Sequence, residues 1–196
     1  MKKVAPILAF LCYFSLMAQP EYRDITLAPT AGFNMSSYSG GDYKTRNSIH
    51  FGVIAEYYFS DNWSGRTGLT FEPMGAKTKD GYTDKLSFIT IPLNANVHLG
   101  WERQWYINFG PSIGFLANAE CRGPNDELIN INDDIAPVDF GFGVGVGRMF
   151  SLGQFMQWFV DIQGYKGFVN MDKNDVLEDS ITNFRVSANF GLIVTL

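Results

Sequence analysis

The chain has 196 residues, of which 46% are hydrophobic and 18% charged, and its formal net charge at pH 7 is −5. A chain of this length favours a single domain, and the net negative charge excludes nucleic acid as an expected partner. Glycine and aromatic residues, including 20 Gly and 17 Phe, provide much of the apolar character, whereas soluble helical domains rely on Leu, Ala, Glu and Lys. The composition therefore favours an all-β protein.

Residues 1–18 have the pattern of a cleaved signal peptide. Lys2 and Lys3 form a positively charged start, residues 4–16 are an apolar run, and Ala18 offers a small residue at the expected cleavage point. The apolar run is too short to span a bilayer comfortably, as is typical of export signals. We therefore expect export through the inner membrane, with cleavage after Ala18.

The two cysteines indicate neither a lipid anchor nor a disulfide. A lipoprotein signal at Cys12 would need a small residue before the cysteine, and Leu11 stands there instead. Cleavage after residue 18 leaves Cys121 alone, so no intramolecular disulfide can form in the oxidising compartment that export reaches. Cleavage also leaves 13 Lys and Arg against 20 Asp and Glu, a net charge of about −7.

Apolar residues alternate with small or polar residues in eight segments of the remaining chain. In chain order the segments are residues 24–35, 49–59, 63–73, 86–99, 104–118, 138–147, 155–165 and 181–196. Alternation over about ten residues is typical of strands that cross a membrane in a β-barrel. No stretch has the roughly 18 apolar residues of a transmembrane helix, and lipid tolerates strands only in a closed barrel. We therefore expect residues 19–196 to form one domain, a closed antiparallel up-and-down transmembrane β-barrel of about eight strands.

Two of these segments carry additional information. Residues 138–147 place Val and Phe on one face, and Asp139 with four glycines on the other. A face of glycines is unsuited to a soluble core, which disfavours a lipocalin-like barrel with its apolar face inside. In residues 86–99, Pro92 lies on the polar face and lacks the N–H of a ladder hydrogen bond, which predicts a bulge or a bend there.

The connections between the segments alternate in length. Residues 60–62, 100–103 and 151–154 are short connections, and residues 36–48, 74–85, 119–136 and 166–180 are long and polar. Short periplasmic turns and longer external loops are typical of outer-membrane barrels. Four tryptophans lie within a few residues of a short connection, where an interfacial aromatic girdle is expected. These residues are Trp63, Trp101, Trp105 and Trp158.

Charged residues also fall on the inward faces of the predicted strands. They are Glu56, Arg66, Asp139, Asp161 and Arg185. Charges inside a narrow barrel must pair or be hydrated, and the interior of eight strands is just wide enough for side chains to fill it. Centring the short turn on Asp61 sets Glu56 opposite Arg66. We therefore expect a Glu56–Arg66 ion pair and a lumen closed to ions.

The histidines and the acidic loops do not indicate a catalytic or metal site. His50 lies at a loop edge and His98 near a short turn, and no serine and carboxylate stand at a spacing that compels a triad. Acidic residues gather in two long loops, at Glu120, Asp126, Glu127, Asp133 and Asp134 and at Asp172, Asp175, Glu178 and Asp179. In the second loop Val176 replaces a ligand of an EF-hand-like pattern, so we interpret both as solvated loops. We expect no enzyme activity, no cofactor and no metal site.

Four motifs stand out along the predicted barrel. They are AGFN at residues 31–34, ITIPLNANV at 89–97, FGPSIGFLAN at 109–118 and DFGFGVGVG at 139–147. Their order and character resemble those of the PorT-like, porin-family small outer-membrane barrels over nearly the whole chain after the signal. The resemblance implies a barrel in the outer membrane of a Gram-negative bacterium, in contact with its lipid, and allows an accessory part in secretion or envelope assembly.

The C-terminal segment carries a second resemblance. Its pattern of a polar residue, a glycine and alternating apolar residues consists of Asn189, Gly191, Leu192, Val194 and Leu196. This pattern resembles the β-signal read by the barrel-assembly machinery, with Leu196 where an aromatic residue is more usual. The resemblance implies that this machinery is a partner during membrane insertion.

Two classes of function remain open from the sequence. The first is a non-enzymatic scaffold or interaction barrel that acts through its external loops in envelope or secretion-related assembly. The second is a small-solute or lipid-binding barrel, including a narrow pore or a soluble lipocalin-like form. The direction of the apolar faces distinguishes a membrane barrel from a soluble one, because a soluble barrel collects its apolar residues inside.

Overall fold

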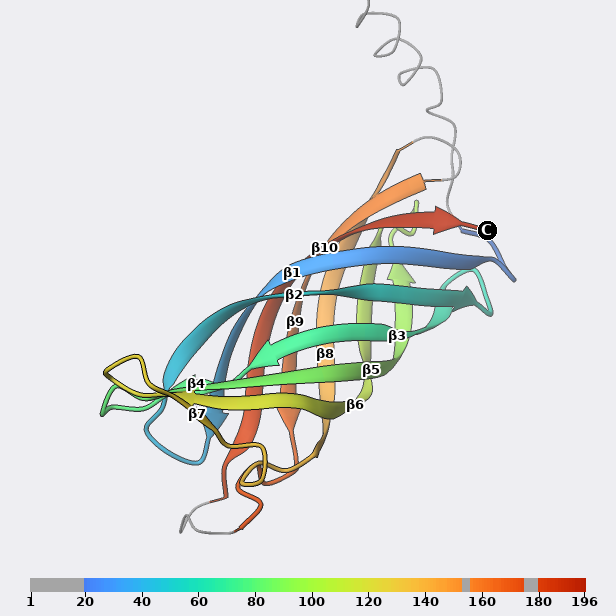
Figure 1. The fold of residues 1–196 in the computed structure, drawn as a ribbon. Coiled ribbons are helices and arrows are strands. Elements are labelled where there is room, and N and C mark those ends of the chain that lie inside the picture. The colour runs from blue at the N-terminus through green and yellow to red at the C-terminus, as the bar shows by residue number, and fades with distance from the viewer. Residues whose placement is uncertain (1–19, 153–155, 175–179) are drawn as a thin grey trace, which may run out of the picture.

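The computed structural model describes residues 20–152, 156–174 and 180–196. The expected signal peptide and Phe155, the first residue of the seventh predicted segment, lie outside the described residues. Figure 1 shows long strands that wrap around a common axis. Their bounds are β1 (Ile25–Ser39), β2 (Lys44–Tyr58), β3 (Trp63–Met74), β5 (Thr83–Leu99), β6 (Trp105–Arg122), β8 (Val138–Ser151), β9 (Met156–Gly167) and β10 (Thr182–Thr195), and two short strands are β4 (Ala76–Lys77) and β7 (Leu128–Asn130). No helix in this part of the chain is long and apolar enough to cross a membrane.

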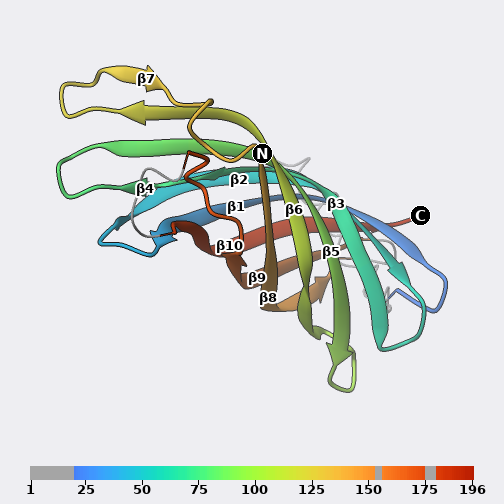
Figure 2. The same ribbon diagram turned by 90° about the horizontal axis from the view of Figure 1, so that it is seen from below.

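The long strands close into an antiparallel barrel, which Figures 1 and 2 show from two directions. Each long strand pairs with the next one along the chain. The last strand then returns to the first, from Thr26 opposite Thr195 to Ser39 opposite Thr182. Closure satisfies the backbone hydrogen bonds that an open edge would leave exposed to lipid. The predicted closed barrel of eight strands is confirmed.

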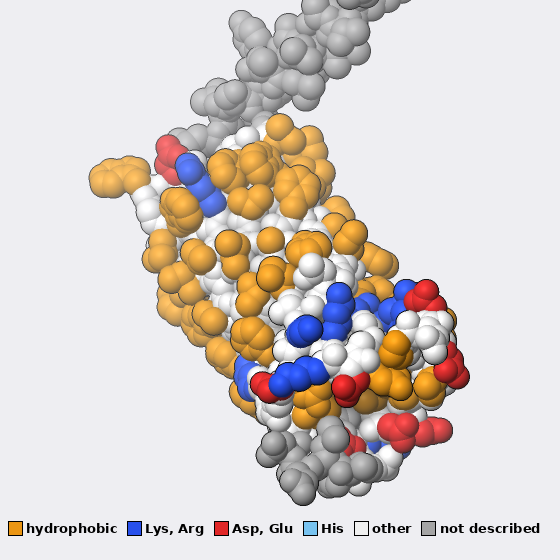
Figure 3. Space-filling view, turned by 90° about the vertical axis from the view of Figure 1, so that its left-hand side faces the viewer, with side chains coloured by type: hydrophobic (Ala, Val, Ile, Leu, Met, Phe, Trp, Pro, Cys, Tyr) orange, Lys and Arg blue, Asp and Glu red, His pale blue; other side chains and the backbone are white. Residues whose placement is uncertain are grey.

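The two faces of each strand differ as the alternation predicts. Outward side chains are apolar and exposed, for example Leu69 at 59% and Val144 at 55%. Inward side chains are buried, and many of them are polar, for example Asn34 at 0% and Asn96 at 1%. Figure 3 shows hydrophobic side chains spread over the wall of the barrel, with most of the visible charged side chains towards one end. This arrangement is that of a lipid-facing barrel and the reverse of a soluble lipocalin-like one.

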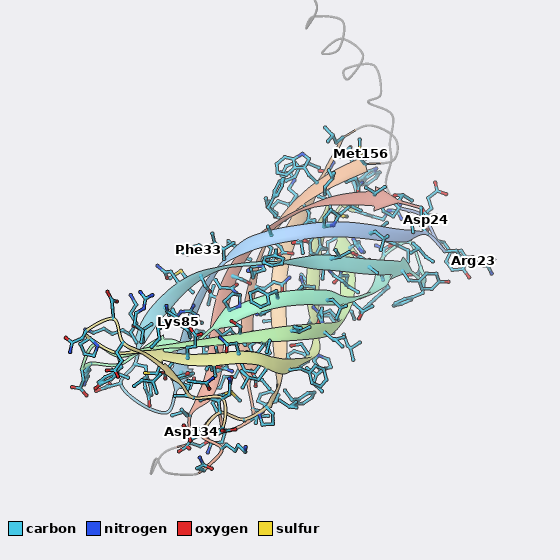
Figure 4. All side chains as sticks on the ribbon, in the orientation of Figure 1. Arg23, Asp24, Phe33, Lys85, Asp134 and Met156 are labelled. Carbon is cyan, nitrogen blue, oxygen red and sulfur yellow. The ribbon has the colours of Figure 1, made fainter. Side chains whose placement is uncertain are left out.

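The short and the long connections lie at opposite ends of the barrel. Figure 4 labels Asp24 and Met156 at the end with the short turns, and Lys85 and Asp134 at the end with the long loops. We call these the periplasmic end and the external end, following the usual orientation of such barrels.

Several strands continue beyond the segments that the sequence predicts. β4 pairs with β2 and β5, and β7 pairs with β6, so residues 36–48, 74–85 and 119–136 are partly strands rather than loops. We define the external extension as β4, β7 and residues 44–45, 83–85 and 120–122. Figure 2 shows it reaching past the rest of the barrel at the external end. Its strands escaped prediction because apolar and polar residues do not alternate along them, as the adjacent Leu128 and Ile129 of β7 illustrate.

One irregularity lies elsewhere than predicted. The sequence predicts a bulge or a bend at Pro92, but the β3–β5 ladder keeps one register on both sides of this proline, so the bulge is not found there. The register shift lies between Ser87 and Phe88, where Ala117 of β6 is the extra residue. Because a bulge changes which side chains face inward, Leu116 and Ala119 both pack inside the barrel although three positions separate them. Pro92 loses a hydrogen bond without needing an extra residue.

Candidate functional site

The lumen contains two apolar clusters with a polar layer between them. The external plug consists of Tyr38, Met74, Ala76, Leu86, Phe88, Ala119, Ile135, Ala136, Met171 and Ile181. The periplasmic plug consists of Ala28, Ile54, Tyr106, Met149, Phe159 and Ile193. The external plug includes residues from the long loops, so these loops fold into the mouth of the barrel instead of standing away from it. The periplasmic plug comes from the strands alone.

Glu72 is the centre of a buried network below the external plug. Arg185 Nη1 lies 2.6 Å from Glu72 Oε2, and Asn34 donates a hydrogen bond to the same oxygen over 2.9 Å. His50 Nδ1 lies 4.0 Å from this oxygen. Arg185 also lies over the ring of Tyr165, with 5.2 Å between the guanidinium carbon and the ring centroid. The network joins β1, β3 and β10 across the lumen and neutralises a carboxylate that burial alone would make costly.

Asp161 is the centre of a second network, above the periplasmic plug. Its Oδ2 lies 3.5 Å from Arg66 Nη1 and accepts a hydrogen bond of 2.7 Å from the Tyr106 hydroxyl. Asn189 donates to the other oxygen. The Arg66 guanidinium carbon lies 5.0 Å from the ring centroid of Phe159, so the cation is held by both charge and ring.

The predicted Glu56–Arg66 pairing holds for the backbone but not for the side chains. The two residues face each other across β2 and β3, and both are 7% exposed. Among the described residues, however, the carboxylate within 4.0 Å of Arg66 is that of Asp161. Glu56 instead accepts hydrogen bonds from Ser64 and from Asn96. Arg66 crosses the lumen to a carboxylate on β9, and adjacent-strand register alone could not reveal that partner.

Glu56, Ser64 and His98 meet in a cluster that resembles the components of a catalytic triad. Ser64 Oγ lies 2.9 Å from His98 Nε2, and Glu56 Oε1 lies 3.2 Å from the same nitrogen. A triad needs the serine and the carboxylate on different ring nitrogens. Ser64 and His98 are at most 1% exposed, so a substrate has no access to them. The cluster therefore lacks the geometry of a triad and lies buried in the lumen.

Asp139, the fifth inward charge, lies close to the external plug. Its Oδ2 accepts a hydrogen bond of 2.8 Å from Asn183, whose side-chain nitrogen also contacts the sulfur of Met171. The structure thus places all five predicted charges inside the barrel. Among them Arg66 pairs with Asp161, whereas Arg185 forms its ion pair with Glu72. Glu72 was missed as a site residue, although its alternation with Phe71 and Pro73 puts it inward.

The space left inside the barrel is small. A hollow of about 60 Å³ lies between the two networks, lined among others by Arg66, Glu72, Thr90 and Arg185. A second hollow of about 10 Å³ lies beside Glu56. Ligand sites usually measure about 300–1,000 Å³, whereas one water needs about 10–15 Å³. These hollows fit a few water molecules and do not fit an organic solute.

The four tryptophans lie at the periplasmic end. Trp63 and Trp105 begin β3 and β6, Trp158 is near the start of β9, and Trp101 is fully exposed in the turn between β5 and β6. Trp158 stacks on Phe150 with 4.2 Å between ring centroids. This is the end of the wall at which the interfacial aromatic girdle is expected.

The acidic loops have few internal partners among the described residues. Arg122 lies 3.6 Å from Asp126 on the surface, and Asn174 donates a hydrogen bond of 3.1 Å to Asp134. Where the chain is described, no three His, Cys, Asp or Glu residues approach closely enough to hold a metal ion. Asp175, Glu178 and Asp179 lie outside the described residues, as does Val176.

The external extension presents a strand, β7, that is paired along one edge. β7 pairs with β6 through residues 120–122, and no other described strand pairs with its far edge. Leu128 and Ile129 of β7 are 55% and 44% exposed. An exposed edge with apolar side chains is a template for strand addition by a partner chain.

The sequence matches the family model described as "Outer membrane protein beta-barrel domain" over residues 17–173. No curated protein matches the sequence. Among solved structures, the outer membrane protein OprG from Pseudomonas aeruginosa is similar at 12% identity and a TM-score of 0.53, over 90% of this chain and 98% of that chain. Neisserial surface protein A gives the same identity and TM-score over 87% of this chain and 96% of that chain. At this identity the two structures support the fold alone.

Proposed function

We propose that this chain, which belongs to the outer-membrane protein β-barrel domain family, is a non-enzymatic anchor that holds partner proteins at the external end of the barrel. Its membrane is the outer membrane of a Gram-negative bacterium. The observation that carries the proposal is the contrast between a lumen filled by two plugs and an extension whose β7 edge is unpaired. A filled lumen leaves the external surface as the part of the molecule that is free to recognise other proteins.

The kind of partner is proposed from the sequence resemblance. The PorT-like motifs favour an accessory part in secretion or envelope assembly. Absence of enzyme activity is supported by the burial of His98 and Ser64 and by the sharing of one ring nitrogen between Ser64 and Glu56. The small hollows of the lumen disfavour the alternative of a solute-binding barrel or a narrow pore.

The closed lumen is tested by recording current in planar lipid bilayers. The purified protein should give no steady conductance, because apolar side chains fill both ends of the lumen and charge networks cross its middle. A stable open channel in the recording would contradict a closed anchor.

The external partner is tested by cross-linking followed by affinity purification from detergent-solubilised outer membranes. A Leu128→Asp, Ile129→Asp variant should lose a partner that the unaltered protein enriches, since charges interrupt an apolar edge contact. Phe168→Asp is the matched control, because Phe168 is also apolar and 60% exposed but lies outside the extension. Equal enrichment by all three proteins, or no enriched partner at all, would overturn the proposed role of the extension.

We propose further that residues 1–18 are cleaved on export and that residues 189–196 of the last strand are read by the barrel-assembly machinery. β10 closes the barrel against β1, so its insertion completes the fold. Gly191 supports a requirement for glycine in this pattern, because a side chain there would meet the ring of Phe159 at 2.3 Å. Deleting Leu196 should lower the amount of folded barrel in outer membranes, measured by heat-dependent gel mobility. Unchanged amounts would argue against this signal.

A further inference from the structure

A groove crosses the lipid-facing wall near the periplasmic end. It has a volume of about 640 Å³ and is lined by side chains from β6, β8, β9, β10 and β1. One wall is a row of directly paired residues, in which Trp105, Arg148, Val160, Phe190 and Ala31 follow one another across neighbouring strands. The lining is mostly apolar. Its exception among the outward side chains is Arg148.

The groove climbs from the periplasmic end towards the middle of the membrane. Trp105 is the first residue of β6, Arg148 is fourth from the end of β8, and Val160 is fifth from the start of β9. Phe190 is sixth from the end of β10, and Ala31 is seventh from the start of β1. Each step along the row therefore lies further from the short turns. One end of the groove is at headgroup depth and the other is among acyl chains.

Arg148 stands at the shallow end of this groove. Its guanidinium carbon lies 5.2 Å from the ring centroid of Trp105 and 4.9 Å from that of Phe150. Its Nη2 donates a hydrogen bond of 3.2 Å to Gln104, while its buried Nε makes no hydrogen bond in the described structure. No carboxylate of the described residues lies within 4.0 Å of Arg148.

An arginine in this position needs an anion. A cation on the lipid face is tolerated near the interface, where the side chain reaches the headgroups. The two rings lie beside the guanidinium, and its Nε makes no hydrogen bond to a described residue. A guanidinium binds phosphate well through paired hydrogen bonds. The anion available at this depth of the inner leaflet is the phosphate of a glycerophospholipid.

The geometry points to a specific phospholipid site, in which Arg148 binds the phosphate of an inner-leaflet glycerophospholipid and one acyl chain lies in the groove. The floor of the groove is formed by Gly32, Gly147, Asp161 and Asn189, whose side chains are absent or turned inward. At the end of the groove furthest from the short turns, the small side chains of Ala31 and Ala188 leave room for an acyl chain. This site is independent of the proposed role of the external end.

The site is tested by native mass spectrometry of the detergent-extracted protein with added phosphatidylglycerol. The unaltered protein should retain one phospholipid, and Arg148→Gln should weaken retention at least about tenfold. Arg103→Gln is the matched control, because it removes a cation in a periplasmic turn outside the groove and should leave retention unchanged. Ala188→Phe should also weaken retention by filling the groove, without removing any charge. Heat-dependent gel mobility verifies that each variant is folded.

Two further ligands identify what is recognised. Diacylglycerol with the same acyl chains should be retained at least about tenfold less than phosphatidylglycerol, because it lacks the phosphate. Inorganic phosphate should not displace the lipid at millimolar concentration, because it lacks the acyl chain. Equal retention of lipid by the unaltered protein and by Arg148→Gln, or equal retention of diacylglycerol, would overturn the proposal. Displacement by inorganic phosphate would reduce it to a simple anion site and would also overturn it.

Discussion

The barrel body and the external extension consist of the same antiparallel strands, but they differ in what their faces meet. In the body one face meets lipid and the other a packed lumen, so every second residue is constrained. In the extension the surroundings are mixed, because Ala76 of β4 is buried in the external plug whereas Leu128, Ile129 and Asn130 of β7 are all exposed. Backbone hydrogen bonds can therefore form a strand without alternation in the sequence. Alternation of apolar and polar residues instead reflects the surroundings of the two faces.

The comparison predicts that substitutions in the lumen cost the most. Arg185→Leu should lower the free energy of unfolding by about 3–5 kcal/mol, because it leaves Glu72 buried without its cation. The measurement is urea unfolding of the barrel in lipid vesicles. The double variant Arg185→Leu, Glu72→Gln should recover much of this loss, since no unpaired charge remains. If the single and double variants lose equal stability, the cost comes from packing and not from charge.

A charge on the outside should distinguish the body from the extension. Val144→Arg places a cation near the middle of β8 on the lipid face, where arginine costs about 2–4 kcal/mol. Leu128→Arg is a matched change at a residue with the same 55% exposure, and it should cost less than about 0.5 kcal/mol because its surroundings are water. The same unfolding assay measures both. Similar losses would mean that β7 lies in the membrane.

The smallest expected effect concerns the reactivity of the Cys121 thiol and not the stability of the barrel. In the extension, burial and the neighbouring Asp84 raise the pKa of the Cys121 thiol to about 11. The thiol is therefore protonated at neutral pH, and its reaction with maleimide should be slow and accelerate as the pH rises towards 11. Asp84→Asn should speed labelling at a fixed pH by removing the second cause of the shift.

The proposed cleavage of residues 1–18 leaves Cys121 as the one thiol for this measurement. Lys85→Gln is the control, because it alters the next residue of β5 without touching the hydrogen bond between Asp84 and Cys121. A labelling rate in Asp84→Asn equal to that of the control would show that burial alone governs the thiol.

The predictability of each region follows from the same contrast. The eight body strands were readable because lipid and lumen impose opposite requirements on neighbouring residues such as Phe140 and Asp139. The extension was not readable, and residues 74–85 and 119–136 were expected to be loops. The bulge at Ala117 was also not predicted from the sequence, although it lets Leu116 and Ala119 both pack against the external plug.

Inside the barrel, sequence reasoning found which side chains point inward but not which ones meet. Register arithmetic correctly set Glu56 opposite Arg66. Their side chains nevertheless choose other partners, because Arg66 is long enough to reach Asp161 on β9 across the lumen. Such contacts depend on the closure and the strand tilt of the whole barrel. The register of two adjacent strands does not give this information.

These cross-lumen contacts have a consequence for biogenesis. Arg66 and Glu72 belong to β3, whereas Asp161 and Arg185 belong to β9 and β10, the last strands to be made. A sheet that lacks those strands holds opposite charges without their partners, and an unpaired charge in an apolar surrounding is costly. Addition of β9 and β10 therefore supplies both the strand that closes the barrel against β1 and the charges that pair with Arg66 and Glu72. An intermediate without these two strands lacks both the hydrogen bonds that close the barrel and the partners of Arg66 and Glu72.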